Sequence, residues 1–421
     1  MRKVKRICLF VLAGLFCLGN LSARKEYKQI RAFMKAGNLN EAVNVVNKCK
    51  KDSATMNDSE LYFLSSEVQR RLNDAQNVKL YLKQPYDTIS FFSSIYGLFD
   101  DLIMCDEKES IPNSKGRVNV KKRGKSHSIL KMYYPNLFNA GLFFIKKKQY
   151  QEADKYFSMY INAAATPIFV MDSLQKCDNK MPRAAFWSMT SCYELKDYKG
   201  VFKFKELALR DSVNIELCLQ YESMSYEALN DKGGMVRELK NGIRRTERKL
   251  FFFSHLADYY NSMKDYNSGL ALCDSLLRVD SNQVMYKFGK VVVLFNLKRY
   301  DECKILSNEV IQKDSTNADA YYYMASCFYN QATDVDDNIK SDLSANAYSK
   351  EKKNANKLFE QSMPYMEKYR KMRPEDTARW AAPLYRIYLS LNIGKQFEEM
   401  DNLLRKLETE KGKATQEETK K

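Results

Sequence analysis

The stretch LFFFSHLADYYNSMKDYNSGLALCDSLLRVDS, residues 250–281, decides the fold of this chain. Its first half has apolar side chains at i, i+3, i+4 and i+7, the spacing that places them on one face of a helix. These residues are Phe253, Leu256, Ala257 and Tyr260. After a break at Lys264-Asp265, a second apolar face is formed by Tyr266, Gly269, Cys273 and Leu276. Because small residues on both faces let two helices approach closely, the stretch predicts a helical hairpin.

The same design recurs along the chain with a fixed period of 34 residues. Corresponding positions are Met189, Ser223, Ala257, Val291 and Ala325. Consecutive steps of equal length in this range indicate an array of helix-turn-helix repeats, in which each unit buries its apolar face against the next. We therefore predict an all-α helical-hairpin solenoid with eight to ten hairpins.

The cleanest unit has the pattern large-x-x-Leu-Ala/Gly-x-x-Tyr, then Tyr-x-x-Ala-x-x-x-Phe. Its members are Leu137, Ala140, Gly141, Phe144, Tyr150, Ala153, Phe157 and Tyr160. This pattern resembles the tetratricopeptide repeat, closely over residues 130–410 and loosely over 25–100. The resemblance implies a right-handed superhelix whose first helices line a concave side. The hallmark proline of the family is seen only at Pro374, and Asp-Ser takes its place elsewhere.

The N-terminus has the layout of a secretory signal. Basic residues precede an apolar run over residues 7–18, and the segment ends in the small residue Ala23. We predict a signal peptide over residues 1–23, cleaved near Ala23. The alternative is a retained membrane anchor, but the run is shorter than the ~20 residues that span a bilayer. Lipid attachment at Cys17 is disfavoured because bulky Phe16 precedes it.

Several segments also resemble exported tetratricopeptide proteins of Bacteroidota. They are residues 86–106, residues 135–141 and the long terminal hairpin after an interrupted repeat. The resemblance and the signal together predict an exported chain, periplasmic or associated with the cell envelope. The resemblance to this group therefore predicts where the protein is located, and it does not predict a mechanism.

Composition divides the remaining chain into six segments. Glycine (15) and proline (8) are scarce, which favours helices with short connections. The expected segments are N-terminal helical hairpins over 24–106, a basic loop over 107–133, the tetratricopeptide repeat array over 134–333, a polar insertion over 334–353, C-terminal helical hairpins over 354–408 and a disordered tail over 409–421. The polar insertion is either a loop or a helical extension.

The formal net charge is +17, and removal of the signal leaves +13. A solvated, lysine-rich surface explains this excess, and contact with an anionic partner is the alternative. Six cations gather in the basic loop: Lys115, Arg117, Lys121, Lys122, Arg123 and Lys125. Without interleaved aromatic residues, the loop lacks the stacking surfaces of a single-strand binder, so a nucleic-acid partner is not favoured.

Residue patterns that support catalysis were sought and not found. The chain has two histidines, His127 and His255, and no zinc-protease, phosphate-loop or nucleophile-elbow motif. Its cysteines are scattered rather than clustered as zinc ligands. Cys192, Cys273 and Cys303 fall on core positions of the repeat and are expected to be buried thiols. We predict no catalytic residue, no metal and no cofactor, hence a protein that is not an enzyme.

A candidate binding surface remains. In the resembled family, positions 2, 5, 9 and 12 of the first helices point into the concave groove. Here these positions include Phe186, Tyr193, Met224, Phe251, Met285, Phe288, Phe295, Tyr322 and Tyr329. Extended apolar surface of this kind usually marks a partner site, although a fully buried helix would show the same composition.

The leading hypothesis is a scaffold that binds a protein or peptide partner of the cell envelope in this aromatic groove. A membrane-associated partner is compatible with it. The alternative is a glycan-binding protein of the bacterial envelope, in which Trp187 and Trp380 would stack on sugar rings. The sequence does not determine the identity of the partner, the oligomeric state or the disulfide status of the cysteines.

Overall fold

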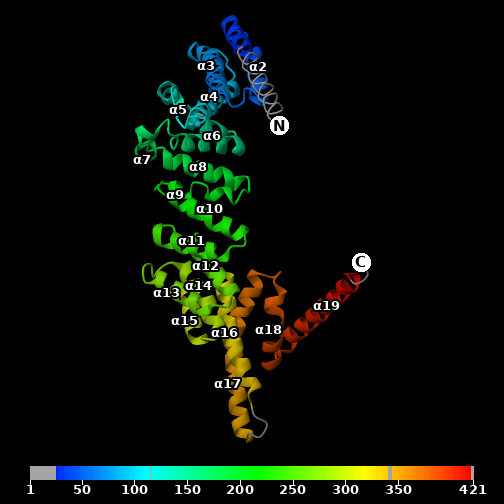
Figure 1. Ribbon diagram of the computed structural model, residues 1–421. Helices are drawn as coiled ribbons and strands as arrows, with labels where there is room; N and C mark the ends of the chain where they lie inside the picture. The colour runs from blue at the N-terminus through cyan, green and yellow to red at the C-terminus, as the bar shows by residue number, and fades with distance from the viewer. Residues whose placement is uncertain (1–24, 114, 340–343, 419–421) are drawn as a thin grey trace, which may run out of the picture. The chain divides into compact units, whose positions relative to one another are not determined.

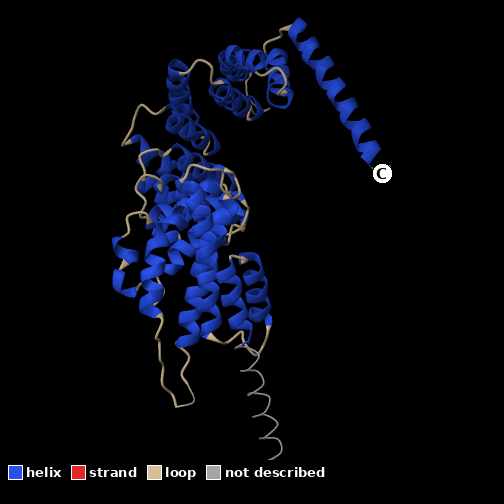
Figure 2. Ribbon diagram, turned by 90° about the horizontal axis from the view of Figure 1, so that it is seen from above, coloured by secondary structure: helices blue, strands red, loops and turns tan. Residues whose placement is uncertain are grey.

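The protein is described by a computed structural model that covers residues 25–113, 115–339 and 344–418. Within these ranges it consists of helices and loops and contains no strand (Figures 1 and 2). The predicted all-α class is therefore confirmed. The predicted signal peptide lies outside the described residues, as does the end of the predicted tail over 419–421.

The chain divides into two compact units, Met1–Asn241 and Gly242–Lys421, which are considered separately. The first unit begins with a helix over 25–36 and continues with α2 (Leu39–Lys51), α3 (Ser59–Tyr81), α4 (Thr88–Glu109), α5 (Arg123–Lys146), α6 (Tyr150–Ala163), η1 (Val170–Asp172), α7 (Leu174–Cys177), α8 (Met181–Glu194), η2 (Gly200–Phe202), α9 (Lys205–Ala208) and α10 (Ile215–Ala228). Helix α11 (Lys232–Arg245) contains the boundary. The second unit has α12 (Leu250–Ser262), α13 (Tyr266–Leu277), α14 (Val284–Asn296), α15 (Tyr300–Lys313), α16 (Ala318–Asp337), α17 (Ala345–Met372), α18 (Thr377–Ser390) and α19 (Gly394–Glu418).

Helices that follow one another in sequence pair as hairpins, as α3 does with α4, α5 with α6, α12 with α13, α14 with α15, α16 with α17 and α18 with α19. The residues 250–281 form α12 and α13, with Phe253, Leu256 and Cys273 buried. Gly269 lies against the next hairpin, because a Cβ placed there would be 3.2 Å from Val293. The closest approach at Gly269 is therefore to the next hairpin, whereas the prediction placed it within one hairpin, where Tyr260 lies 3.8 Å from the added Cβ.

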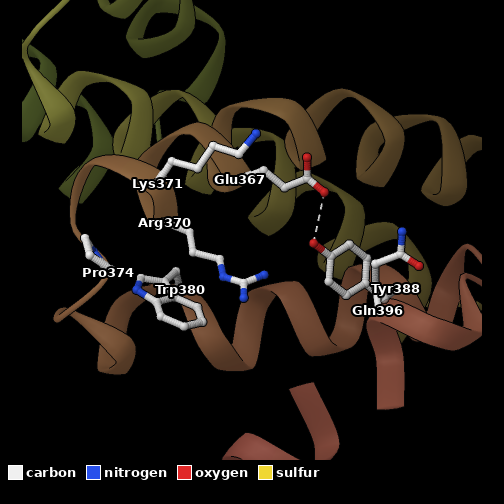
Figure 3. A pocket seen from close by; sticks show the side chains of 7 residues that line it. All are labelled: Glu367, Arg370, Lys371, Pro374, Trp380, Tyr388 and Gln396. Atoms are coloured by element: carbon white, nitrogen blue, oxygen red, sulfur yellow. Dashed lines mark hydrogen bonds between the residues drawn. The ribbon is translucent and has the colours of Figure 1, made fainter. Parts of the chain in front are cut away.

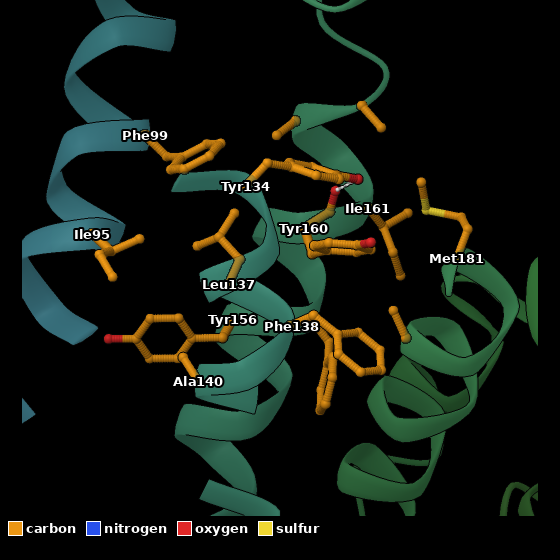
Figure 4. Close-up of a cluster of buried hydrophobic side chains, with 14 of the residues drawn as sticks. Ile95, Phe99, Tyr134, Leu137, Phe138, Ala140, Tyr156, Tyr160, Ile161 and Met181 are labelled. Atoms are coloured by element: carbon orange, nitrogen blue, oxygen red, sulfur yellow. Dashed lines mark hydrogen bonds between the residues drawn. The ribbon is translucent and has the colours of Figure 1, made fainter. Parts of the chain in front are cut away.

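The core of the first unit is rich in aromatic side chains between α4, α5, α6 and α8 (Figure 4). Tyr134 stacks on Tyr160 with ring centroids 4.3 Å apart, and its hydroxyl donates to the carbonyl oxygen of Tyr160 at 2.9 Å. Gly141 on α5 makes room for Phe157 on α6, whose ring atom Cζ would lie 2.5 Å from an added Cβ. These contacts fix the distance between the two helices of the cleanest repeat.

Helix α4 is, by length and composition, apolar enough to cross a membrane. Half of the relevant window is buried inside the protein, and Ile95, Phe99 and Leu102 belong to the core of the first unit. Its apolar character is thus accounted for by packing against α5.

Three segments differ from the sequence-based expectation. The second helix after Met189 is broken into η2 and the single turn α9. The basic loop is shorter than predicted, because α4 continues to Glu109 and α5 begins at Arg123. The charged ends of these helices pair across the loop, which lets both helices extend into it.

Near the C-terminus, the polar insertion follows the second of its two predicted alternatives, a helical extension, and the predicted tail is the third difference. Helix α16 continues to Asp337 and α17 starts at Ala345, so most of the polar insertion extends the hairpin. Helix α19 continues to Glu418, through most of the segment predicted as a disordered tail. Lysine, glutamate and glutamine lower the hydropathy of a tail, but they are also good helix formers, and this explains the difference.

Candidate functional site

The first helices of the second unit keep part of the predicted groove accessible. Met285, Phe288 and Phe295 lie at i, i+3 and i+10 on α14, on one face of that helix. Met285 is 43% exposed, and both phenylalanines are half-buried. The ring of Tyr323 on α16 packs beside both, 6.0 Å from Phe288 and 5.2 Å from Phe295.

Phe251, another predicted residue, lies on the preceding first helix, α12, which contacts α14. Its ring is half-buried and packs on His255 with ring centroids 4.1 Å apart, and the Nδ1 of His255 lies 2.9 Å from the carbonyl oxygen of Phe251. We call Phe251, Met285, Phe288 and Phe295 the aromatic strip. Each of these four predicted side chains remains partly open to solvent.

The last two predicted groove residues of this unit are also half-buried, and they pack on later helices. Tyr322 packs on Tyr369 of α17 at 5.2 Å, and the guanidinium of Arg379 lies 4.7 Å above its ring. Tyr329 packs on Phe359 of α17 at 5.9 Å. The long helix α17 and its partner α18 thus contact this face of α16, and these tyrosines contribute to helix packing.

In the first unit the predicted residues are buried or pack on neighbouring side chains. Phe186 is buried and packs beside Trp187 at 4.9 Å. Tyr193 stacks on Tyr221 of α10 at 4.5 Å, and its hydroxyl donates to the sulfur of Met224 at 3.4 Å. Within the first unit, Phe186 is thus a core residue, and Tyr193 and Met224 contact each other.

The six cations of the basic loop divide into two groups. Lys115, Arg117 and Lys121 are exposed. Lys122 pairs with Glu109 at 2.9 Å, Arg123 pairs with Asp106 at 2.7 Å, and Lys125 lies 4.7 Å above the ring of Phe63. The second group holds the ends of α4 and α5 together. In the sequence, the acidic residues Asp106 and Glu109 were the signal that could have predicted this role.

A pocket of about 570 Å³ lies among α17, α18 and α19 (Figure 3). Arg370 lies over the ring of Trp380 at 5.1 Å and also pairs with Glu399. The Tyr388 hydroxyl donates to Glu367 at 2.9 Å. Only 4% of Trp380 is exposed, so its ring offers no stacking face to a sugar. The other predicted stacking residue, the tryptophan of α8, is half-buried in the first unit.

The hairpin turns carry a regular backbone signature. Lys196, Asn230, Lys264 and Lys298 lie 34 residues apart, and each has a positive φ between 56° and 59°. One left-handed residue per period, at the same place in each hairpin, shows that the sequence period is a structural period. The hairpins are of the tetratricopeptide type.

The chain is similar to solved structures of tetratricopeptide proteins at low sequence identity. No protein-family model and no curated protein matches the chain. Among solved structures, it is similar to the C-terminal part of a tetratricopeptide protein from Cytophaga hutchinsonii, with 14% identity, a TM-score of 0.41 and coverage of 62% of this chain and 92% of that one. A tetratricopeptide protein from Bacteroides fragilis is 17% identical over 64% of this chain and 98% of its own, with a TM-score of 0.30.

YrrB, a tetratricopeptide protein with an unusual peptide-binding site, is 12% identical and covers 50% of this chain and 96% of its own length, with a TM-score of 0.35. The assignment of the hairpins rests on the 34-residue register of this chain.

The tetratricopeptide-type hairpins of the first unit contain a charge cluster that sequence reasoning missed. Glu222 on α10 and Glu238 on α11 are buried, and Lys205 on α9 lies 3.4 Å from one and 3.8 Å from the other. Burial raises the pKa of Glu222 to about 7, although Lys205 opposes the shift. The Oε1 atom of Glu222 has no hydrogen-bond partner among the described residues. No sequence pattern distinguishes these glutamates from surface residues.

The described residues contain no group of three or more histidine, cysteine or acidic side chains that could hold a metal ion. His127 contacts Asp172 at 3.0 Å and packs on Phe169, so its role in the fold is structural. Cys192, Cys273 and Cys303 are buried, as predicted for core thiols. The side chains of the aromatic strip are apolar and partly accessible to solvent, so they are suited to binding a partner through apolar contact.

Proposed function

We propose that the protein is a non-catalytic scaffold whose aromatic strip binds an extended segment of a protein partner. The observation behind this proposal is the line of Met285, Phe288 and Phe295 on one face of α14, beside Phe251 on α12, with part of each side chain open to solvent. Partly exposed apolar surface of this kind is typical of partner sites, and aromatic side chains supply most of the energy in such interfaces.

The stacked hairpins determine how the strip would act. Phe288 and Phe295 are held from below by the ring of Tyr323, so they lose little side-chain freedom when a partner covers them. Lys264 and Lys298 are exposed at the turns of the two adjacent hairpins. Cations at these positions would steer partners with acidic flanks and increase the rate of association.

We also propose that the scaffold works in the cell envelope after export. The support is the basic and apolar layout of residues 1–23. N-terminal sequencing of the chain recovered from the native periplasm tests it, with a start close to residue 24 as the expected result. Recovery of the intact N-terminus in the cytoplasm would contradict export while leaving the strip proposal open to its own test.

The strip is tested with a photo-crosslinking amino acid at position 285, because Met285 is its most exposed member. Ile305 on α15, the second helix of the same hairpin, is 66% exposed and provides the matched control position. We expect a discrete adduct from position 285 in native envelopes, and none of the same mass from position 305. Phe251→Ala in the same chain should weaken the adduct.

The result that opposes the proposal is an adduct pattern that is identical at the two positions, or one found only at 305. Circular dichroism of each variant shows whether the fold is intact. Isolation of the adduct followed by mass spectrometry then identifies the partner and the segment that lies on the strip.

A further inference from the structure

Three hairpin turns of the first unit lie along one edge. Helices α4 and α5 run antiparallel, because residues near the start of α4 contact residues near the end of α5, and residues near the end of α4 contact residues near the start of α5. These contacts are Phe92 with Phe143 at 5.4 Å, Phe99 with Tyr134 at 6.4 Å and Asp106 with Arg123 at 2.7 Å. The start of α4 therefore lies beside the end of α5, and the α3–α4 turn lies beside the α5–α6 turn.

The same reasoning places the next turn on this edge. Ser188 of α8 donates to Asp154 near the start of α6 at 2.5 Å, while Tyr160 near the end of α6 donates to Asp178, just before α8. Helices α6 and α8 are thus antiparallel, and the end of α8 lies beside the start of α6. We call residues 77–87, 146–149 and 194–199, which form these three turns, the turn edge.

The turn edge is strongly basic. Its lysines are all exposed, and they are Lys79, Lys83, Lys146, Lys147, Lys148, Lys196 and Lys199. Its acidic residues are Asp87, Glu194 and Asp197. Asp87 accepts from the backbone N–H of Ser90 at 3.0 Å and Asp197 accepts from that of Gly200 at 3.0 Å, and both carboxylates keep their charge. Seven exposed lysines against three acidic residues leave an excess of four cations on the turn edge.

One end of the turn edge is also apolar. Tyr81 is 87% exposed, and its neighbours Val78 and Leu82 are 58% and 56% exposed. Together with Leu80, which is also exposed, these residues form the end of α3, and we call them the apolar tip. Lys79 and Lys83 lie within and directly after it. Exposed aliphatic and tyrosine side chains interleaved with lysines are typical of segments that enter the membrane interface.

We propose that the turn edge docks the protein on a bilayer with anionic headgroups. The apolar tip enters the headgroup region, where a tyrosine can keep its hydroxyl in contact with water. The lysines of all three turns contact lipid phosphates, and their long side chains let the charged groups reach these phosphates. A row of cations along three parallel turns suits a flat anionic surface better than a concave protein partner. This site lies in the first unit and does not depend on the aromatic strip.

The test is flotation of the mature chain with vesicles of phosphatidylcholine, with and without phosphatidylglycerol. We expect binding to the anionic vesicles and much weaker binding to the neutral ones. Tyr81→Ser/Leu82→Ser and Lys147→Glu/Lys148→Glu should each lower the partition coefficient at least about tenfold, the first through lost apolar burial and the second through lost attraction to the lipid.

Two matched controls lie on the opposite edge, where α4 ends and α8 begins. Lys115→Glu/Lys121→Glu makes the same change in charge within the basic loop, and Val170→Ser/Met171→Ser removes two exposed apolar side chains of η1. Both controls should leave vesicle binding within about twofold of the parent. All substituted side chains are exposed, and equal melting temperatures verify that the fold is retained.

The proposal is overturned if the parent chain does not float with anionic vesicles, or if either control reduces binding as much as the turn-edge variants do. It is also overturned if the apolar-tip variant binds as well as the parent, because insertion of the tip is part of it. Raising the ionic strength should weaken binding of the parent, since the attraction between lysines and phosphates is screened.

Discussion

Glu222 shows how a single buried residue can make stability depend on pH. Burial raises its pKa from 4.5 to about 7, so the folded state favours the protonated form. The stability from the neutral carboxyl is complete below about pH 4.5 and is lost as the pH rises through about 7. We expect Glu222→Gln to remove this loss and to stabilise the protein at pH 8 by up to about 3 kcal/mol relative to its effect at pH 5. Urea unfolding at the two pH values measures the difference.

The control for this prediction is Glu227→Gln on the same helix, where the side chain is exposed. That variant should show the pH dependence of the parent. If Glu222→Gln also retained it, the carboxyl of Glu222 would have an ordinary pKa and the slope would arise elsewhere.

Lys298 illustrates a backbone cost at the turn of a hairpin. Its φ is 58°, in the left-handed region that L-residues with a Cβ avoid at a cost of roughly 1–2 kcal/mol. Glycine removes that cost, although it adds freedom to the unfolded chain. We expect Lys298→Gly to raise the free energy of unfolding by about 0.5–1 kcal/mol, measured by denaturant titration.

Lys357, which is exposed in the interior of α17, gives the opposite case. Glycine there should destabilise by about 1 kcal/mol, as in any helix interior. Equal effects at the two lysines would show that the left-handed conformation costs nothing at the turn.

At the scale of helices, much of the hairpin fold is readable from the sequence because its core positions are periodic. Residues 250–281 predict two amphipathic helices and a break, and α12 and α13 follow this pattern. The break in the helix after Met189 was not predicted. It lies at Lys203 and Phe204, between η2 and α9. The repeat period places apolar side chains on a helix face, and it does not tell where along the segment a helix is interrupted.

The candidate site could be predicted only in part, for a related reason. A repeat position tells which face of a helix a side chain occupies, so the line of Met285, Phe288 and Phe295 was identified. It does not tell whether a later helix covers that face. Tyr322 has the same repeat position as Phe288, yet α17 and α18 cover it.

Gly141 tests how closely the two helices of a hairpin must approach. An added Cβ would be 2.5 Å from the ring of Phe157, which is fully buried and has no room to move. We expect Gly141→Ala to destabilise the protein by about 1–3 kcal/mol through overpacking, seen as a lower melting temperature.

Gly124 in the first turn of the same helix has no atom within 4 Å of an added Cβ. Alanine there should be neutral or stabilise by up to about 1 kcal/mol, because it favours the helix. A loss of stability at Gly124 similar to that at Gly141 would mean that the loss at Gly141 does not come from the contact with Phe157.

At the scale of the second unit, helices contact mainly those that precede or follow them in sequence, together with the next first helix. A disturbance should therefore remain near its origin, as in other stacked-repeat proteins.

Phe359 on α17 is fully buried and packs on Tyr329 of α16. We expect Phe359→Ala to cost about 3–5 kcal/mol locally and to speed amide hydrogen exchange in α16, α17 and α18. Exchange in α12 and α13 should stay within error of the parent, since neither helix contacts α17 in the described residues beyond isolated contacts. A uniform rise across the unit would instead indicate a single cooperative core, and the aromatic strip would then depend on packing at a distance from it.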